Sequence, residues 1–191
     1  PPGHHAEPDR PMGFCLFNNI AIAAKYALSH YGLERVALID FDVHHGNGSE
    51  VAFQNDPAVL MCSFFQSPLY PYSGLNSKRQ NMVNIPVPAH SNGEMIRALV
   101  RNSWLPALEA FRPEFIFISA GFDAHEADML AQLELVEEDY AWITTELVQV
   151  AKKHAQGRMV SCLEGGYHLG ALASSSLAHV QALMKAVNEG R

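Results

Sequence analysis

Four short apolar runs, separated by segments of helical length, constrain the fold of this chain more than any other feature. The runs are rich in Val, Ile, Leu and Phe and cover residues 36–39, 59–63, 115–120 and 159–163. Buried parallel strands have this composition, and the segments between them are long enough to cross over as helices. The sequence therefore predicts an α/β fold of three layers, α/β/α, in which helices cover both faces of a mainly parallel sheet.

Capping residues and amphipathic spacing place the helices between the strands. The predicted helices cover residues 18–30, a short segment after residue 48, 92–108, 137–154 and about 169–187. A kink or break is expected at Pro106, because proline disrupts a helix interior. Residues 64–92 contain several prolines and are predicted to be irregular, with aromatic residues that either line a pocket or only fix the loop to the core.

Length and composition exclude several classes of protein. The chain has 191 residues, 48% of them hydrophobic, which suits one globular domain covering residues 1–191. No apolar run is long enough for a membrane span, and we expect a cytoplasmic protein, or a nuclear one in a eukaryote. The net charge of −7 without a basic patch argues against direct binding of nucleic acid. Three cysteines in apolar surroundings indicate reduced thiols rather than a disulfide framework.

Polar side chains follow three of the apolar runs at the point where each run ends. Asp40, Asp42 and His44 close the first run, Asp123 follows the third and Tyr167 follows the fourth. The carboxyl ends of parallel strands meet at one edge of a sheet, where ligands bind in open α/β folds. Side chains two apart on an extended backbone share a face, so the first three residues are expected to converge. The alternative is that Asp and Gly residues only shape a solvated loop there.

Three of these side chains have the character of zinc ligands. Asp42, His44 and Asp123 would leave a fourth position open, which is the pattern of catalytic and not of structural zinc. Such a zinc ion lowers the pKa of a water molecule and polarises a carbonyl group. The sequence therefore predicts a metal centre suited to hydrolysis.

Histidines near the start of the chain could complete this chemistry. A neutral imidazole of His4 or His5 could accept the proton of the water, and the Tyr167 hydroxyl could hydrogen-bond to the developing oxyanion. The alternative for the two histidines is that they are exposed or derive from an expression tag. Together these groups predict a hydrolase for an amide or an ester.

Five segments of the sequence resemble the zinc-dependent histone deacetylase family, of the class II-like kind that includes bacterial amidohydrolases. The segments are PPGHHA at residues 1–6, GFC at 13–15, DFDVHHGNG at 40–48, SAGFDAH at 119–125 and LEGGY at 163–167. The resemblance implies an arginase-like α/β fold and removal of acetyl groups from lysine side chains or related amines. An acetylated lysine peptide or acetylated amine would be the substrate.

The resemblance also implies a role for each matching position. Asp42, His44 and Asp123 would bind zinc, and Tyr167 would hold the substrate carbonyl. His5 would be the general base and acid, with Asn47 as its partner, and His4 would be an electrostatic group oriented by Asp40. The substrate would be contacted by Gly13 and Gly165, by Phe14 and Tyr70 as channel walls, and by Leu130 near the channel mouth. A potassium ion would lie beneath the zinc, held by Asp40, Asp42, His44, Ser63 and Phe64, partly through main-chain oxygens.

Two positions refine the implied activity. Asn47 stands where many class I members have Asp, so the partner of His5 is neutral here, as in class II relatives. Tyr167 is retained where some class II members carry His, which favours deacetylation over acetyl-lysine binding alone.

The length of the family domain leaves other functions open. It is much longer than this chain, so the chain resembles its carboxyl-terminal part, with a sheet edge that is open or pairs in a homo-oligomer. The alternatives are an acetylpolyamine or other acyl-amine hydrolase, a non-catalytic module that binds acyl-lysine or metal, and an arginase-type two-metal hydrolase. The last of these would need more carboxylates near Asp123 than the sequence supplies.

Overall fold

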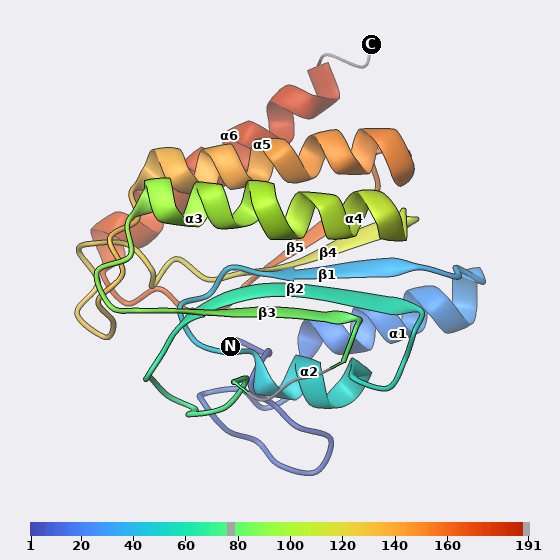
Figure 1. The fold of residues 1–191 in the computed structure, drawn as a ribbon, viewed down its shortest axis with the longest axis horizontal. Helices are drawn as coiled ribbons and strands as arrows, with labels where there is room; N and C mark the ends of the chain where they lie inside the picture. The colour runs from blue at the N-terminus through green and yellow to red at the C-terminus, as the bar shows by residue number, and fades with distance from the viewer. Residues whose placement is uncertain (76–78, 189–191) are drawn as a thin grey trace.

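One sheet of five parallel strands organises the computed structural model, which describes residues 1–75 and 79–188 (Figure 1). The strand order is β3-β2-β1-β4-β5. The strands are β1 (Val36–Asp40), β2 (Val59–Gln66), β3 (Met82–Val87), β4 (Phe115–Ala120) and β5 (Met159–Leu163). All pairs run parallel, with Asp40 opposite both Ser63 and Ser119 at the carboxyl end of the central strand.

Helices cover both faces of this sheet, which confirms the predicted three layers (Figure 1). One face carries α1 (Asn19–Tyr31) and α2 (Asn47–Phe53). The other face carries α3 (Gly93–Leu99), the π-helix η1 (Val100–Trp104), α4 (Leu105–Phe111), α5 (Glu137–His154) and α6 (Leu169–Asn188). Side-chain caps begin two of the helices as predicted, because Asn18 accepts from Ala21 N and Asn92 accepts from Met95 N.

The prediction of an irregular segment over residues 64–92 is wrong at its start and in its interior, whereas residues 88–92 are irregular as predicted. Strand β2 continues to Gln66, and β3 lies within the segment and pairs with β2. Strand β3 contains Pro86, which lacks a backbone N–H and therefore favours a loop when the sequence is considered alone. The sheet tolerates this proline because β3 is an edge strand with a neighbour on one side only.

The predicted kink or break at Pro106 takes a different form. Helix α3 leads directly into η1 and α4, and the N–H of Leu105 bonds to the carbonyl of Val100 five residues earlier. Pro106 lies in the first turn of α4, directly after this π turn. The helix therefore accommodates the proline with one π turn ahead of it, and its path is not broken.

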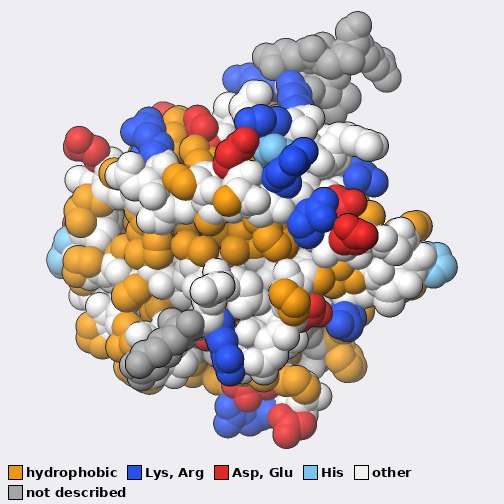
Figure 2. All heavy atoms as spheres, turned by 45° about the vertical axis from the view of Figure 1, so that its right-hand side comes forward, with side chains coloured by type: hydrophobic (Ala, Val, Ile, Leu, Met, Phe, Trp, Pro, Cys, Tyr) orange, Lys and Arg blue, Asp and Glu red, His pale blue; other side chains and the backbone are white. Residues whose placement is uncertain are grey.

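Two apolar clusters hold the layers together. The smaller one joins α1 to the sheet through Ile20 and Leu38, and the larger one joins the sheet to the helices α3 to α6 through residues such as Trp104. Partly buried side chains, among them Val83 and Ile85 of β3, pack against the larger cluster. Figure 2 shows apolar side chains gathered in a band at the level between the helical layer and the sheet.

Strand β5 forms the edge of the sheet opposite β3, and its side chains are unusually open. Leu163 is 53% exposed and Val160 is 40% exposed, whereas every residue of β1 is buried. Pairing of two copies through this edge stays a prediction. Within residues 1–75 and 79–188, no helix combines the length and the apolar character that crossing a bilayer requires.

Candidate active site and metal centre

The predicted metal ligands meet beyond the carboxyl ends of β1 and β4. Asp42, His44 and Asp123 each offer an atom, and these atoms lie within 4.8 Å of one another. The expected convergence of Asp40 with them is wrong, because β1 ends at Asp40 and the alternation of side chains ends with it. The backbone then bends, so that Asp42 and His44 turn toward Asp123 while Asp40 points to His4.

The geometry of this cluster fits a cation. His44 Nδ1 lies 2.9 Å from Asp42 Oδ1 and 3.1 Å from Asp123 Oδ2. Asp123 Oδ2 is buried, and its contact with His44 Nδ1 lacks hydrogen-bond geometry, so this oxygen has no hydrogen-bond partner among the described residues. A Cβ atom on Gly165 would lie 2.1 Å from that oxygen, and one on Gly121 would lie 2.2 Å from Asp42 Oδ2. Two glycines therefore keep open a small space lined by carboxylate and imidazole ligands, which suits zinc.

The protonation of the cluster agrees with a site that exchanges protons for a metal. Burial lowers the pKa of His44, but the adjacent Asp123 and Asp42 carboxylates raise it more, to about 10. Burial and the charge of Asp42 raise the pKa of Asp123 to about 6. Without a metal the imidazole therefore holds a proton at neutral pH, and a bound cation would displace it.

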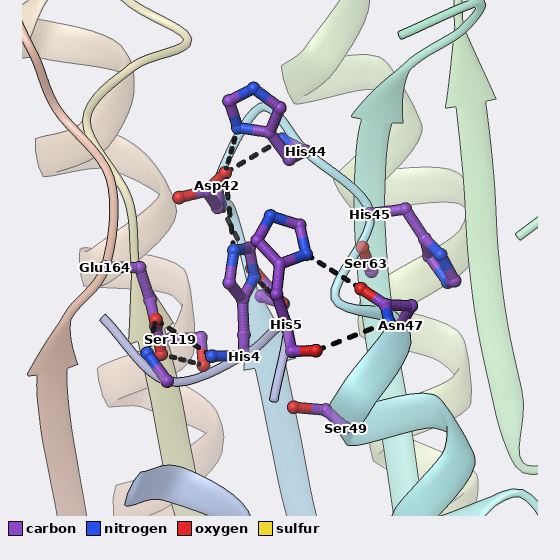
Figure 3. Close-up of polar contacts among 12 residues, drawn as sticks. His4, His5, Asp42, His44, His45, Asn47, Ser49, Ser63, Ser119 and Glu164 are labelled. Carbon is purple, nitrogen blue, oxygen red and sulfur yellow. Dashed lines mark hydrogen bonds and ion pairs between the residues drawn. The ribbon is translucent and has the colours of Figure 1, made fainter. Parts of the chain in front are cut away.

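The two tandem histidines have different partners, as Figure 3 shows. His4 Nδ1 lies 2.9 Å from Asp40 Oδ2, and His5 Nδ1 lies 2.8 Å from Asn47 Oδ1. Burial lowers the pKa of His4, but the charges of Asp40 and Asp42 raise it well above its usual value. Both side chains are buried, so neither histidine is an exposed tag remnant.

The charge of His4 determines the state of His5. Burial and the neighbouring His4 charge lower the pKa of His5 to about 3. The two rings are 4.1 Å apart between centroids, which makes a second positive charge costly. At neutral pH His4 is therefore the charged member of the pair, and His5 is the neutral one that can accept a proton.

Tyr167 reaches the site from the loop after β5. The loop turns at Gly166, whose φ of 142° suits glycine, and the Tyr167 side chain stays 41% exposed. Burial and the negative charges of Asp123 and Asp42 raise the pKa of its hydroxyl. Tyr167 therefore keeps its proton at neutral pH and can donate a hydrogen bond.

The predicted channel residues surround the same space. Phe14 lies 6.2 Å from Tyr167 and Tyr70 lies 5.1 Å from His5, measured between ring centroids. A Cβ atom on Gly13 would lie 2.2 Å from His5 Cδ2, so the close approach of this backbone needs glycine. Phe14 is 74% exposed, so the space beside Phe14 and Tyr167 is open toward solvent.

Other predicted residues lie farther from the ligands. Leu130 is half-exposed on the loop after β4, and it connects to Tyr167 through Asp128, which binds the backbone of both. Ser63 and Phe64 lie buried on β2, with Ser63 opposite Asp40 in the sheet. The Ser63 hydroxyl donates to the Phe64 carbonyl at 3.3 Å.

Two carboxylates without a predicted role, Glu164 and Asp128, hold the loops of the site. Glu164 accepts from the backbone N–H groups of Gly3 (2.6 Å) and His4 (3.1 Å) and from Ser119 Oγ (2.9 Å) (Figure 3). Glu164 carries a signal like that of Asp42 and Asp123, an acid close behind an apolar run. Asp128 carries no such signal, because it lies within a loop, and only the structure reveals its contacts.

The geometry of the site agrees with the comparison to known proteins. The family model of the histone deacetylase domain matches residues 1–183 of this chain. The chain belongs to the histone deacetylase family.

Relatives and solved structures support this membership. Histone deacetylase 14, chloroplastic, from Arabidopsis thaliana is 41% identical in an alignment of 190 residues that covers 96% of this chain and 45% of that protein. A histone deacetylase-like amidohydrolase from Pseudomonas aeruginosa is 39% identical, over 96% of this chain and 50% of that protein. The crystal structure of the HDA15 HD domain has a TM-score of 0.88 at 33% identity, covering 97% of this chain and 54% of that one. This deacetylase-family chain thus spans about half the length of each of these proteins.

Proposed function

We propose that this chain carries the active site of a zinc-dependent deacetylase that hydrolyses the acetyl amide of N-acetyl-lysine. One observation carries the proposal: the Asp42, His44 and Asp123 cluster lies beside a neutral His5 and a protonated Tyr167. Zinc is the cation that the family and the ligand types favour. When bound, zinc supplies Lewis acidity, which makes a water molecule acidic near neutral pH and polarises a carbonyl group.

His5 handles the protons of the reaction. Its Nδ1 is engaged by Asn47 Oδ1, an acceptor, so Nδ1 carries the hydrogen and Nε2 has a free lone pair. Nε2 takes the proton of the attacking water and later gives it to the departing lysine amine. His4 stays charged against Asp40 and adds positive potential where negative charge develops.

Tyr167 stabilises the carbonyl oxygen as that oxygen gains negative charge. Its hydroxyl remains protonated and donates a hydrogen bond that strengthens in the transition state. Loss of one such donor typically costs ~3 kcal/mol in the barrier, which corresponds to a rate about two orders of magnitude lower. Phe14 and Tyr70 flank the acyl-lysine stem, since their rings lie beside Tyr167 and His5.

A potassium ion beneath the zinc is part of the proposal. Asp40 and Ser63 are opposite each other and fully buried at the end of the sheet, next to the Phe64 carbonyl. A monovalent cation there would balance the carboxylates of Asp40 and Asp42, with His44 contributing its main chain. Oxygen ligands of this kind suit a hard cation.

Hydrolysis of a free acetylated polyamine is the second candidate. The channel wall at Phe14 is largely exposed, so nothing in that wall requires the peptide backbone of a protein substrate. Leu130 is apolar and does not select a second cationic amine. A non-catalytic acyl-lysine module is less well supported, because such a module needs neither a proton acceptor like His5 nor a hydroxyl donor like Tyr167.

A two-metal arginase-type reaction has weaker support still. Among residues 1–75 and 79–188, the Asp42, His44 and Asp123 set is the one cluster with metal-ligand spacing. The nearby carboxylate of Asp128 already accepts from three backbone N–H groups. A second ion would have to compete with those hydrogen bonds.

Acetate release from an N-acetyl-lysine peptide by the zinc-loaded protein tests this proposal. We expect release by the wild type and a loss of most turnover in Tyr167→Phe, which removes only the hydroxyl. The same assay with N-acetylputrescine separates the two candidate substrates. Tight peptide binding by zinc-loaded protein without acetate release would contradict the proposal and support the binding module.

A further inference from the structure

We propose that Glu7 is a positioning residue that sets the tautomer of His5 by fixing the orientation of the Asn47 amide. The inference rests on the proposed function, since it assigns His5 the role of proton acceptor. It concerns a residue outside the metal cluster and outside the channel. Its physical basis is the set of three acceptors around the amide nitrogen Nδ2 of Asn47.

The Asn47 side chain connects Glu7 to His5. Asn47 Oδ1 lies 2.8 Å from His5 Nδ1, while Asn47 Nδ2 donates to Glu7 Oε1 at 2.8 Å. Nδ2 also lies 3.3 Å from the His5 carbonyl oxygen and 3.3 Å from Met12 Sδ. Glu7 provides the shortest of these three contacts and the only full negative charge among them. Hydrogen bonds to a charged acceptor are the stronger kind, so Glu7 dominates the orientation of the amide.

A flipped amide would disable His5. It would place Oδ1 against the Glu7 carboxylate and the His5 carbonyl, where oxygen faces oxygen. It would also place the NH₂ group against His5 Nδ1, which would then have to accept and leave the hydrogen on Nε2. His5 in that tautomer has no lone pair to offer toward the substrate. Glu7 therefore favours the competent tautomer by excluding the flipped amide.

The position of Glu7 suits this role and makes it testable. Glu7 begins a turn that closes on Arg10, through backbone hydrogen bonds of 3.0 and 3.4 Å and an ion pair of 2.9 Å. Its side chain is 20% exposed at the wall of a cavity of about 770 Å³, which Asn47 also lines. Water can reach the group, so Glu7→Ala leaves no buried charge without a partner, and we expect the variant to fold.

Steady-state kinetics of Glu7→Ala give the first test. Loss of the charged acceptor is expected to lower kcat about tenfold. KM should stay unchanged, because Glu7 lies behind Asn47 and away from the channel. Asp9→Ala is the matched control, since it removes the same charge from an exposed position on the same turn. This control should stay within about twofold of the wild type.

A second substitution separates orientation from general support of the loop. In Asn47→Asp both oxygens accept, so no amide orientation remains to be fixed, and Glu7 becomes a repelling neighbour. Glu7→Gln should therefore raise kcat in the Asn47→Asp background, although it lowers kcat slightly in the wild type. An equal loss from the Glu7 substitution in both backgrounds would overturn the inference, because a merely structural role predicts it.

The tautomer can also be observed without turnover. Proton–nitrogen NMR correlations of zinc-loaded protein, with the His5 signal identified by its absence in His5→Gln, should show hydrogen on Nδ1 in the wild type. In Glu7→Ala we expect a shift toward hydrogen on Nε2. An unchanged Nδ1–H tautomer in Glu7→Ala would overturn the inference even if the enzyme is active. If the wild type releases no acetate but the tautomer shifts, the proposed function fails and this inference stands.

Discussion

Replacement of Asp128 by Ala should disable Tyr167 without touching the metal ligands. The Asp128 carboxylate is buried at 4% exposure and accepts from Tyr167 N at 2.7 Å and His168 N at 3.1 Å through Oδ2. Its Oδ1 accepts from Leu130 N at 3.0 Å. The carboxylate thus fixes the loop that presents the Tyr167 hydroxyl.

The size of the effect follows from these three contacts. Each hydrogen bond to a charged group contributes about 1.5–3 kcal/mol, and loop rearrangement with water entry recovers part of it. We therefore expect Asp128→Ala to lower the free energy of unfolding by about 3 kcal/mol. When the loop moves, the Tyr167 hydroxyl no longer reaches the carbonyl oxygen of the substrate. We therefore expect kcat to fall about 100-fold, the typical loss for one oxyanion donor. Asp128→Asn keeps one acceptor oxygen and should lie between Ala and the wild type.

Steady-state deacetylation by Asp128→Ala, Tyr167→Phe and the double variant checks this reasoning. The two losses in kcat should not add, because both remove the same hydrogen bond to the carbonyl oxygen. Bound zinc, measured per chain, should equal that of the wild type. The positioning role of Asp128 would be refuted if the two losses in kcat multiplied in the double variant. It would also be refuted if Asp128→Ala were destabilised but kept a normal kcat.

The remaining predictions concern metal and protons. Because the pKa of His44 is about 10 without metal, zinc affinity should rise about tenfold per pH unit from pH 7 to 9, as competition titrations can measure. Because the pKa of His44 is raised in the fold, its protonation adds to the free energy of unfolding of the metal-free protein. This contribution is complete below pH 6.5 and is lost as pH rises through 10. Calorimetry of metal-free protein should therefore give a Tm that falls over that range, and a constant Tm would contradict it. Tyr167→Phe should bind zinc like the wild type yet lose turnover about 100-fold.

Local signals in the sequence were sufficient for most of the architecture. Apolar runs predicted β1, β2, β4 and β5. Capping residues predicted the starts of two helices, at Asn18 or Asn19 and at Ser91 or Asn92, and the structure has Asn18 and Asn92 as the caps. Strand β3 was not predicted, because Pro86 is typical of a loop. The position of β3 at the edge of the sheet, which allows the proline, depends on tertiary structure.

The cluster of Asp42, His44 and Asp123 could be predicted because acids and histidines beyond strand ends are recognisable without knowledge of packing. The roles of Gly13, Phe14, Tyr70 and Leu130 followed only from the family resemblance.

Contacts between distant residues could not be predicted in the same way. Glu7 binds Asn47 across 40 positions, and Asp128 binds Tyr167 across 39. A carboxylate on a loop is usually solvated, so neither residue stands out in the sequence. The meeting of Asp42 with His44 was predicted correctly but for the wrong reason, since a bend after β1 brings them together and not strand alternation.

Stepwise addition of zinc to metal-free protein, followed by acetate release from an N-acetyl-lysine peptide, tests the central claim most directly. We expect release that grows with added zinc and saturates near one ion per chain. Asp123→Ala should bind no zinc at that site and stay at the baseline. Full zinc occupancy in Asp123→Ala, or release by the wild type that is independent of zinc, would contradict the assignment of Asp42, His44 and Asp123 as the catalytic metal centre.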